Sequence, residues 1–121
     1  MCPVYINRIA SIHAESRNEK PYFSAQEPDY KEMITNANLR RRMSRMIKMG
    51  VACGLECLKD IPSEKVDAII TATGLGCLAD TEKFMNALMD NREQMLNPTA
   101  FIQSTFNTVG AQLALLLKIH A

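Results

Sequence analysis

The residues best suited to covalent or metal chemistry in this chain are its cysteines and histidines. The four cysteines stand at positions 2, 53, 57 and 77, and the two histidines stand at positions 13 and 120. No two cysteines form CxxC, no second cysteine or histidine pair stands at zinc-finger spacing, and the histidines lie at opposite ends of the sequence. The spacing therefore predicts neither a metal site nor a bound cofactor.

Cys77 is the thiol placed where a nucleophile could be activated, because it follows a glycine turn and precedes a predicted helix, whose N-terminus favours the thiolate. Catalysis would also need a base, and neither histidine can be placed beside Cys77 from the sequence. Free cysteine is among the most buried residue types, so a core thiol is the favoured interpretation and a nucleophile is the alternative. The turn, with Gly74 and Gly76, departs from a dinucleotide-binding fingerprint at Ala79, so we expect its glycines to serve the tight turn.

A run of basic residues is the more informative binding signal. Its members are Arg40, Arg41, Arg42, Arg45 and Lys48, and the stretch around them contains no acidic residue. The sequence places them in the first half of a helix, where the macrodipole disfavours positive charge. Such a cluster favours an acidic partner, and we predict docking through Arg41, Arg45 and Lys48. The alternative is a solvated face paired with loop carboxylates such as Glu27 and Asp29.

The composition is that of one globular domain, residues 1–121, with 47% hydrophobic and 22% charged residues. A formal net charge of +1 favours neither nucleic acid nor an anionic membrane as a partner. No uncharged apolar stretch reaches the roughly 18 residues of a membrane span. Because residues 1–8 show no basic segment ahead of an apolar run, we expect a cytoplasmic protein with reduced thiols.

The order of predicted elements indicates an α/β fold. Apolar residues predict strands over 4–12 and 66–72, and the polar residues 13–30 predict a long loop. Helical periodicity predicts a helix capped by Asn36 or Asn38 that runs to about Lys59, a helix from about Asp80 to Asn91 that Asp80 or Thr81 can cap, and a helix over 107–118. Residues 97–99 are expected to form a turn and residues 101–105 an extended segment.

Two sequence features predict close packing. Gly50 and Gly54 stand four residues apart on the buried face of the long helix, and each costs roughly 1 kcal/mol relative to alanine, so we expect another backbone to pass very near. The last helix is apolar nearly all round, which requires burial on most sides. Because a domain of this size cannot cover that helix completely, we expect the chain to associate into a dimer.

Three segments of the chain resemble the β-ketoacyl-acyl-carrier-protein synthases. Residues 97–114 resemble the family segment that reads P-x-x-F-x-x-S-T-x-N-x-x-(A/G)-x-x-(I/L)-A. Residues 41–48, followed by small residues, resemble the family's R-R-M helix, and residues 66–74 resemble its next strand and glycine turn. The closest subtype is that of the divergent synthases of aryl-polyene and flexirubin-type pigments, whose phrase FIQSTxNTVGAQLALLLK is similar to residues 101–118.

The resemblance implies the thiolase-like fold, with this chain as the N-terminal portion of one of its two βαβαβαββ halves. It also implies acyl-chain extension by decarboxylative Claisen condensation, in fatty acid or polyketide synthesis. In that family the nucleophilic cysteine follows the segment matching residues 112–121, so no catalytic residue is assigned in this chain. Asn107 matches the family's recurrent asparagine, and we expect Asn107 and Thr105 to lie near the active site for structural reasons.

The partners that the resemblance implies are an acyl carrier protein, docked on the basic residues, and a second ketosynthase in a homodimer or heterodimer. The alternative function is a non-catalytic subunit, like a chain-length factor, that pairs with an active synthase and binds carrier protein. A more distant alternative is an unrelated small α/β binding domain.

Overall fold

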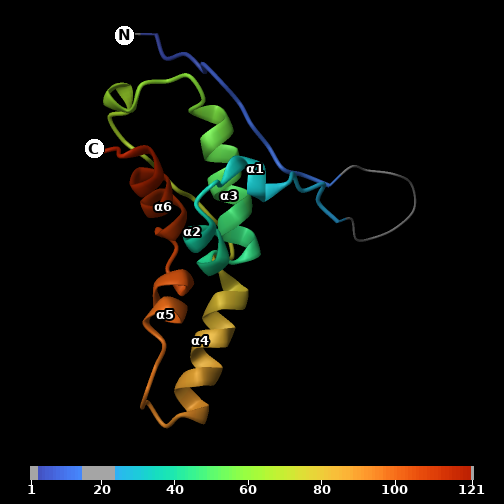
Figure 1. The fold of residues 1–121 in the computed structure, drawn as a ribbon, viewed down its shortest axis with the longest axis vertical. Coiled ribbons are helices and arrows are strands. Elements are labelled where there is room, and N and C mark those ends of the chain that lie inside the picture. Colours follow the sequence, from blue (N-terminus) through green and yellow to red (C-terminus); the bar gives the residue numbers. More distant parts are fainter. Residues whose placement is uncertain (1–2, 15–23, 121) are drawn as a thin grey trace.

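The computed structural model describes residues 3–14 and 24–120 of the chain, and Figure 1 shows how they are arranged. The described residues form α1 (Tyr30–Met33), α2 (Ala37–Arg42), α3 (Arg45–Cys57), the 3-10 turn η1 (Ser63–Lys65), α4 (Leu78–Asp90), α5 (Pro98–Ser104) and α6 (Thr108–Leu117). An isolated antiparallel bridge joins Ala14 to Ala25. The part of the chain that is described is therefore mainly helical.

The core of the molecule lies around α3, which packs against α1 on one side and α6 on the other (Figure 1). Its largest fully buried side chains are Ile34, Ile47 and Val51, and Met43 and Leu113 belong to the same cluster. Fully burying a side chain of this size contributes about 1.5–3 kcal/mol. This cluster therefore fixes how α3 and α6 dock on each other.

The close neighbour predicted at Gly50 and Gly54 is present, but it consists of side chains of α6 and not of its backbone as expected. A Cβ atom built on residue 50 would lie 2.8 Å from Cγ1 of Val109, and one built on residue 54 would lie 2.7 Å from Cδ2 of Leu113. Both neighbours belong to α6. The two glycines thus let the side chains of α6 rest directly on the backbone of α3.

The helix predicted from Asn36 or Asn38 to Lys59 is interrupted, so that prediction is wrong in one respect. Asn36 caps α2 by accepting hydrogen bonds from the two backbone amides that follow Ala37. Met43 is then extended, and Ser44 precedes the first residue of α3. Because the Met43 side chain is only 6% exposed, its burial offsets the interruption of the helix.

Residues 101–105 were expected to be extended, and this is wrong because all but the last of them lie in α5. Asn97 accepts a hydrogen bond from the backbone amide of Thr99 at 2.9 Å, and Pro98 occupies the first position of the helix. Asparagine at the N-cap and proline just after it are a helix start signal as much as a turn signal. α5 packs along α4, with the rings of Phe84 and Phe101 5.5 Å apart.

The two predicted strands, residues 4–12 and 66–72, are extended but have no ladder partner among the described residues. In the second segment Ile69 and Thr71 lie against Gly110 of α6, whereas Ile70 is 91% exposed. This alternation is that of a strand with one face on a helix. Since a strand needs a neighbouring backbone to form its hydrogen bonds, the expected sheet does not form in the described part, and the α/β prediction is not confirmed there.

The N-terminal segment, residues 3–14, runs alongside α3 and is called the arm below (Figure 1). Arg8 donates a hydrogen bond to the carbonyl oxygen of Lys59 at 2.5 Å and pairs with the Asp60 carboxylate at 3.4 Å. At the other end the backbone amide of Gln26 donates to the carbonyl oxygen of His13 at 3.2 Å. The arm is thus fixed near both ends of its path over α3.

No single helix in the described ranges is long and apolar enough to cross a membrane. α5 and α6 reach the required length and composition only as a pair, and they are bent by 105° relative to each other.

Candidate functional site: a basic face beside an apolar pocket

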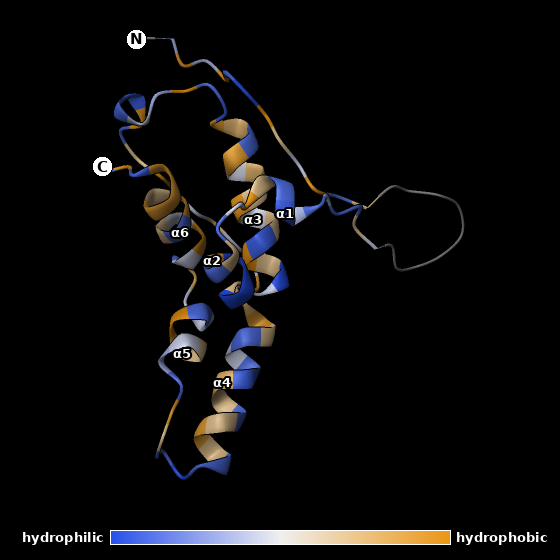
Figure 2. Ribbon diagram, viewed as in Figure 1, coloured by the Kyte–Doolittle hydropathy of each residue, from blue (hydrophilic) through white to orange (hydrophobic). Residues whose placement is uncertain are grey.

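The predicted docking residues lie at the junction of α2 and α3. Arg41 is in the last turn of α2, Arg45 is the first residue of α3, and Lys48 follows within the next turn. Arg41 and Arg45 are exposed and Lys48 is half-buried. These three residues are called the basic face below, and Figure 2 shows hydrophilic ribbon at this junction.

The conflict expected between these cations and a helix dipole applies to only one part of the cluster. Arg40, Arg41 and Arg42 occupy the last turn of α2, where the macrodipole favours positive charge. Arg45 is in the first turn of α3, where positive charge is disfavoured. Because the helix ends at Met43, the three arginines interact favourably with the dipole of α2. Arg45 interacts unfavourably with the dipole of α3, so a nearby anion would stabilise it.

Glu27 supplies an anion for Arg45. Its Oε1 accepts a hydrogen bond from Nε of Arg45 at 2.5 Å, and its Oε2 accepts one from the Tyr30 hydroxyl at 2.6 Å. The hydrogen bonds from Tyr30 and Arg45 hold the pKa of the Glu27 carboxyl below its usual value. Burial, together with the bond to Glu27, raises the pKa of the Tyr30 hydroxyl.

The pairing that the sequence offered as the alternative for the basic residues is therefore present at Glu27. Asp29, the other carboxylate considered, instead caps α1 by accepting a hydrogen bond from the backbone amide of Lys31 at 2.8 Å. The contribution of Tyr30 was not predicted. Tyr30 stands three residues after Glu27 in the sequence, and this short separation is the only feature of the sequence that brings the two side chains near each other.

An apolar pocket of about 350 Å³ opens between α3, the extended residues 69–73 and the start of α6. Met46, Ile70, Cys77 and Phe106 are among its lining residues, and it is called the Phe106 pocket below. A neighbouring hollow of about 270 Å³ shares Met46 and Cys77 and is also lined by Arg45. The two hollows are therefore adjacent, and together they extend from Phe106 to Arg45 of the basic face.

Thr105 and Asn107, predicted to lie near an active site, flank Phe106 in the link between α5 and α6. The Thr105 hydroxyl donates to the carbonyl oxygen of Ile102 and contacts Oγ1 of Thr108, each at 2.8 Å. Asn107 is exposed, and its side chain makes no capping hydrogen bond to the first turn of α6. Thr105 therefore holds the link in shape, while Phe106 is the residue of the three that lines the pocket.

Cys77 lies at the start of α4, buried at 6% exposure, and the helix begins at Leu78 rather than at about Asp80 as predicted. Cys77 itself, and neither Asp80 nor Thr81, stands at the N-cap position. Burial raises the pKa of the Cys77 thiol, and the negative charge of Asp80 raises it further. Burial likewise raises the pKa of Cys53. A raised pKa disfavours the reactive thiolate, so the structure favours the core-thiol interpretation of Cys77.

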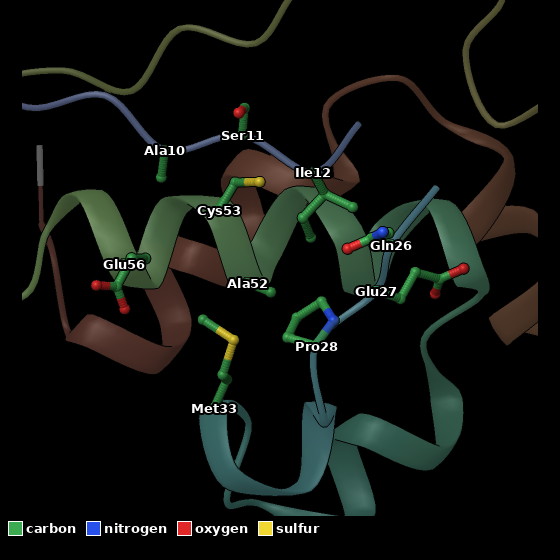
Figure 3. Close-up of a pocket in the computed structure, with 10 residues that line it drawn as sticks. All are labelled: Ala10, Ser11, Ile12, Gln26, Glu27, Pro28, Met33, Ala52, Cys53 and Glu56. Atoms are coloured by element: carbon green, nitrogen blue, oxygen red, sulfur yellow. The ribbon is translucent and has the colours of Figure 1, made fainter. Parts of the chain in front are cut away.

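A separate cavity of about 450 Å³ lies beneath the arm, and Figure 3 shows the residues that line it. Ala10 and Ile12 of the arm cover one side, and Cys53 of α3 and Met33 of α1 form others. Sequence reasoning missed this cavity because its walls come from segments far apart in the chain. Within the described ranges no three histidine, cysteine, aspartate or glutamate side chains gather into a group that could hold a metal ion.

Comparison with protein families matches residues 13–120 to the description "Beta-ketoacyl synthase, N-terminal domain". A search of curated proteins finds no match for the chain. The matched stretch contains the basic face and the Phe106 pocket, and this family implies the thiolase-like fold and a condensing-enzyme region. Because the match spans nearly the whole sequence, the chain belongs to the family of beta-ketoacyl synthase N-terminal domains.

Proposed function

We propose that this chain is the amino-terminal part of a condensing enzyme that extends acyl chains held on an acyl carrier protein by decarboxylative Claisen condensation. The observation that carries this proposal is the family match over residues 13–120. The amino-acid sequence of residues 101–118, which span most of α5, the link and α6, is similar to that of the aryl-polyene and flexirubin-type synthases. This similarity supports the finer assignment to that subtype. Residues 1–121 are proposed to form one partial thiolase-like domain.

The role proposed for the basic face is to dock the carrier protein. Acyl carrier proteins are acidic, and the exposed guanidinium groups of Arg41 and Arg45 offer charge complementarity. Lys48 adds a third cation within one turn of Arg45. Docking of this kind accelerates association and weakens as salt rises.

The role proposed for the Phe106 pocket is to face apolar parts of the substrate or of a partner subunit. Its walls are mostly apolar, and the hollow beside it reaches Arg45. Thr105 holds the link that carries Phe106, and Asn107 offers an exposed carboxamide at the start of α6. This arrangement supports a structural place near the active site for Thr105 and Asn107.

A second candidate function is a non-catalytic subunit, like a chain-length factor, that pairs with an active synthase. This candidate needs no nucleophile within the chain, and burial raises the pKa of both Cys53 and Cys77, which disfavours a nucleophile on either. The first candidate places its nucleophile after residues 112–121, so the state of these thiols fits both candidates. As a non-catalytic subunit, the chain contributes a docking surface and a pairing surface. The two candidates differ in what the gene encodes beyond codon 121, which sequencing of the gene tests: a cysteine on an elbow followed by two histidines favours the first candidate, and their absence favours the second.

The docking role is tested by binding of a purified acidic holo-acyl carrier protein. Reversing the charge of Arg41 and Arg45 together is expected to weaken binding about tenfold at low salt. The matched control is Lys83→Glu, a charge reversal at an exposed lysine of α4, for which we expect a change within about twofold. Equal effects of the two changes would contradict docking on the basic face.

A further inference from the structure

We infer that Glu27 restrains the basic face: it occupies Arg45 within the chain, and an acidic carrier protein must displace it to bind there. This inference rests on the docking role proposed above for Arg41, Arg45 and Lys48. It concerns the regulation of that surface by the carboxylate that the sequence offered only as a pairing partner.

The contact itself is a short, charge-assisted pair. Glu27 Oε1 accepts from Arg45 Nε at 2.5 Å, and the Tyr30 hydroxyl holds the other oxygen at 2.6 Å. Both oxygens of the carboxylate are thereby engaged, so Glu27 is oriented toward α3 before any partner arrives. Figure 3 shows the Glu27 carboxylate near the N-terminal end of α3 and pointing away from Met33 and the middle of the cavity.

The two partners differ in their freedom to move. The Glu27 side chain is only 24% exposed, whereas the Arg45 side chain is 66% exposed. Arg45 can therefore exchange Glu27 for an outside carboxylate by turning its long side chain, while Glu27 stays in place. The negative charge of Glu27 also acts on Lys48, so it opposes two of the three cations of the basic face.

The position of Glu27 makes it an effective competitor. The segment that carries it is tied to the arm through the amide of Gln26, and Asp29 anchors it to the start of α1. A group held in this way acts at a high effective concentration, which a free partner in solution has to overcome. Because exposed ion pairs are individually weak, we expect removal of the Glu27 charge to tighten carrier binding about two- to fivefold.

The test compares variants of the whole chain in which one carboxylate is replaced by a neutral amide. Their binding to a purified holo-acyl carrier protein is measured at low salt. Glu27→Gln keeps an oxygen that can accept from Tyr30 but removes the charge, and it is expected to tighten binding about two- to fivefold. Glu32→Gln is the matched control, because it makes the same charge change at an exposed residue of α1 and is expected to leave binding within about 1.5-fold. Far-ultraviolet circular dichroism checks that each variant is folded.

A double-mutant cycle makes the test specific to the pair. In Arg45→Ala the competitor has lost its cation, so adding Glu27→Gln is expected to change binding by less than half of its effect in the unmodified chain. If Glu27→Gln binds no more tightly than the unmodified chain while charge reversal of Arg41 and Arg45 still weakens binding about tenfold, the restraint is wrong and the docking role stands. If reversal of Arg41 and Arg45 leaves binding unchanged, the docking role itself is wrong and the restraint is rejected with it.

Discussion

Gly54 of α3 lies directly beneath the Leu113 side chain of α6, so closely that a Cβ on residue 54 would meet Cδ2 of Leu113 at 2.7 Å. Leu113 is itself buried, at 6% exposure, and belongs to the core cluster. The neighbour therefore cannot give way as a flexible surface side chain could. The contact decides how near α3 and α6 can approach, and it leads to the first prediction.

Gly54→Ala is expected to lower the free energy of unfolding by about 1–3 kcal/mol, because overpacking against Leu113 outweighs the gain of roughly 1 kcal/mol in helix propensity. Urea titration followed by circular dichroism measures this difference. Gly74→Ala is the matched control: no atom lies within 4 Å of a Cβ built there, and its backbone is not left-handed. A Gly54 variant as stable as the Gly74 variant would contradict the packing argument.

The sequence predicted a close neighbour at this position, but it did not predict that the neighbour is a side chain of α6. The spacing of Gly50 and Gly54 indicated a close backbone because small residues on a buried helix face have few other uses. The break at Met43 was missed because burial of one side chain in the core is a tertiary effect, invisible to helical periodicity.

In the candidate site, too, some features could be predicted from the sequence and others depend on the tertiary structure. The basic residues were visible as a run of charge, and Glu27 and Asp29 were both candidate partners, but which of them pairs with Arg45 depends on how the segment before α1 folds back onto α3. The Phe106 pocket was hidden because its walls come from three segments distant in the chain. The two extended segments have strand-like patterns, and without a neighbouring backbone such a pattern cannot become a ladder.

The N-cap residues of two helices, Asn36 of α2 and Ser44 of α3, give a second prediction. Asn36 accepts hydrogen bonds from the amides of Asn38 and Leu39 at the start of α2, each at 3.1 Å, whereas Ser44 makes no side-chain capping bond at the start of α3. Asn36→Ala is therefore expected to cost about 1 kcal/mol of stability. Ser44→Ala is expected to cost less than about 0.5 kcal/mol, since no capping bond is lost. Chemical denaturation of both variants checks the order, and equal losses would contradict it.

Cys77 gives a prediction about reactivity and pH. Because burial and Asp80 raise the pKa of its thiol above the usual value of 9.0, we expect alkylation by iodoacetamide at pH 7 to be slower than in the urea-unfolded chain. As the pH rises, the Cys77 thiol loses its proton at a higher pH in the folded chain than in the unfolded chain. The free energy of unfolding therefore keeps the contribution of this thiol below pH 9 and loses it as the pH rises through the thiol's pKa in the folded state. Mass spectrometry of the labelled cysteines measures the alkylation rate. Urea titration at several pH values measures the stability, and Cys77→Ala is expected to reduce the loss of stability above pH 9.

The same thiol bears on activity. The purified 121-residue chain is expected to show no condensation turnover with acyl and malonyl carrier proteins, because the described residues supply no activated nucleophile. The assay is release of carbon dioxide with product analysis by mass spectrometry. Turnover that Cys77→Ala abolishes would show that the buried thiol is the nucleophile after all.

The exposed apolar side chains of α6 and its neighbours give the last prediction, that the chain associates. Leu115 is 62% exposed on α6, and Phe106 and Ile70, which line the apolar pocket, are 72% and 91% exposed. Each such side chain gains about 1.5–3 kcal/mol when it is fully buried, so a second surface that covers several of them is strongly favoured. We expect light scattering at tens of micromolar to give the mass of a dimer. Leu115→Lys is expected to shift the mass toward a monomer, whereas Lys83→Glu, on the exposed side of α4, should leave the dimer intact. A well-behaved monomer for the unmodified chain at that concentration would defeat the prediction, and a dimer that persists in Leu115→Lys would move the contact to a different face.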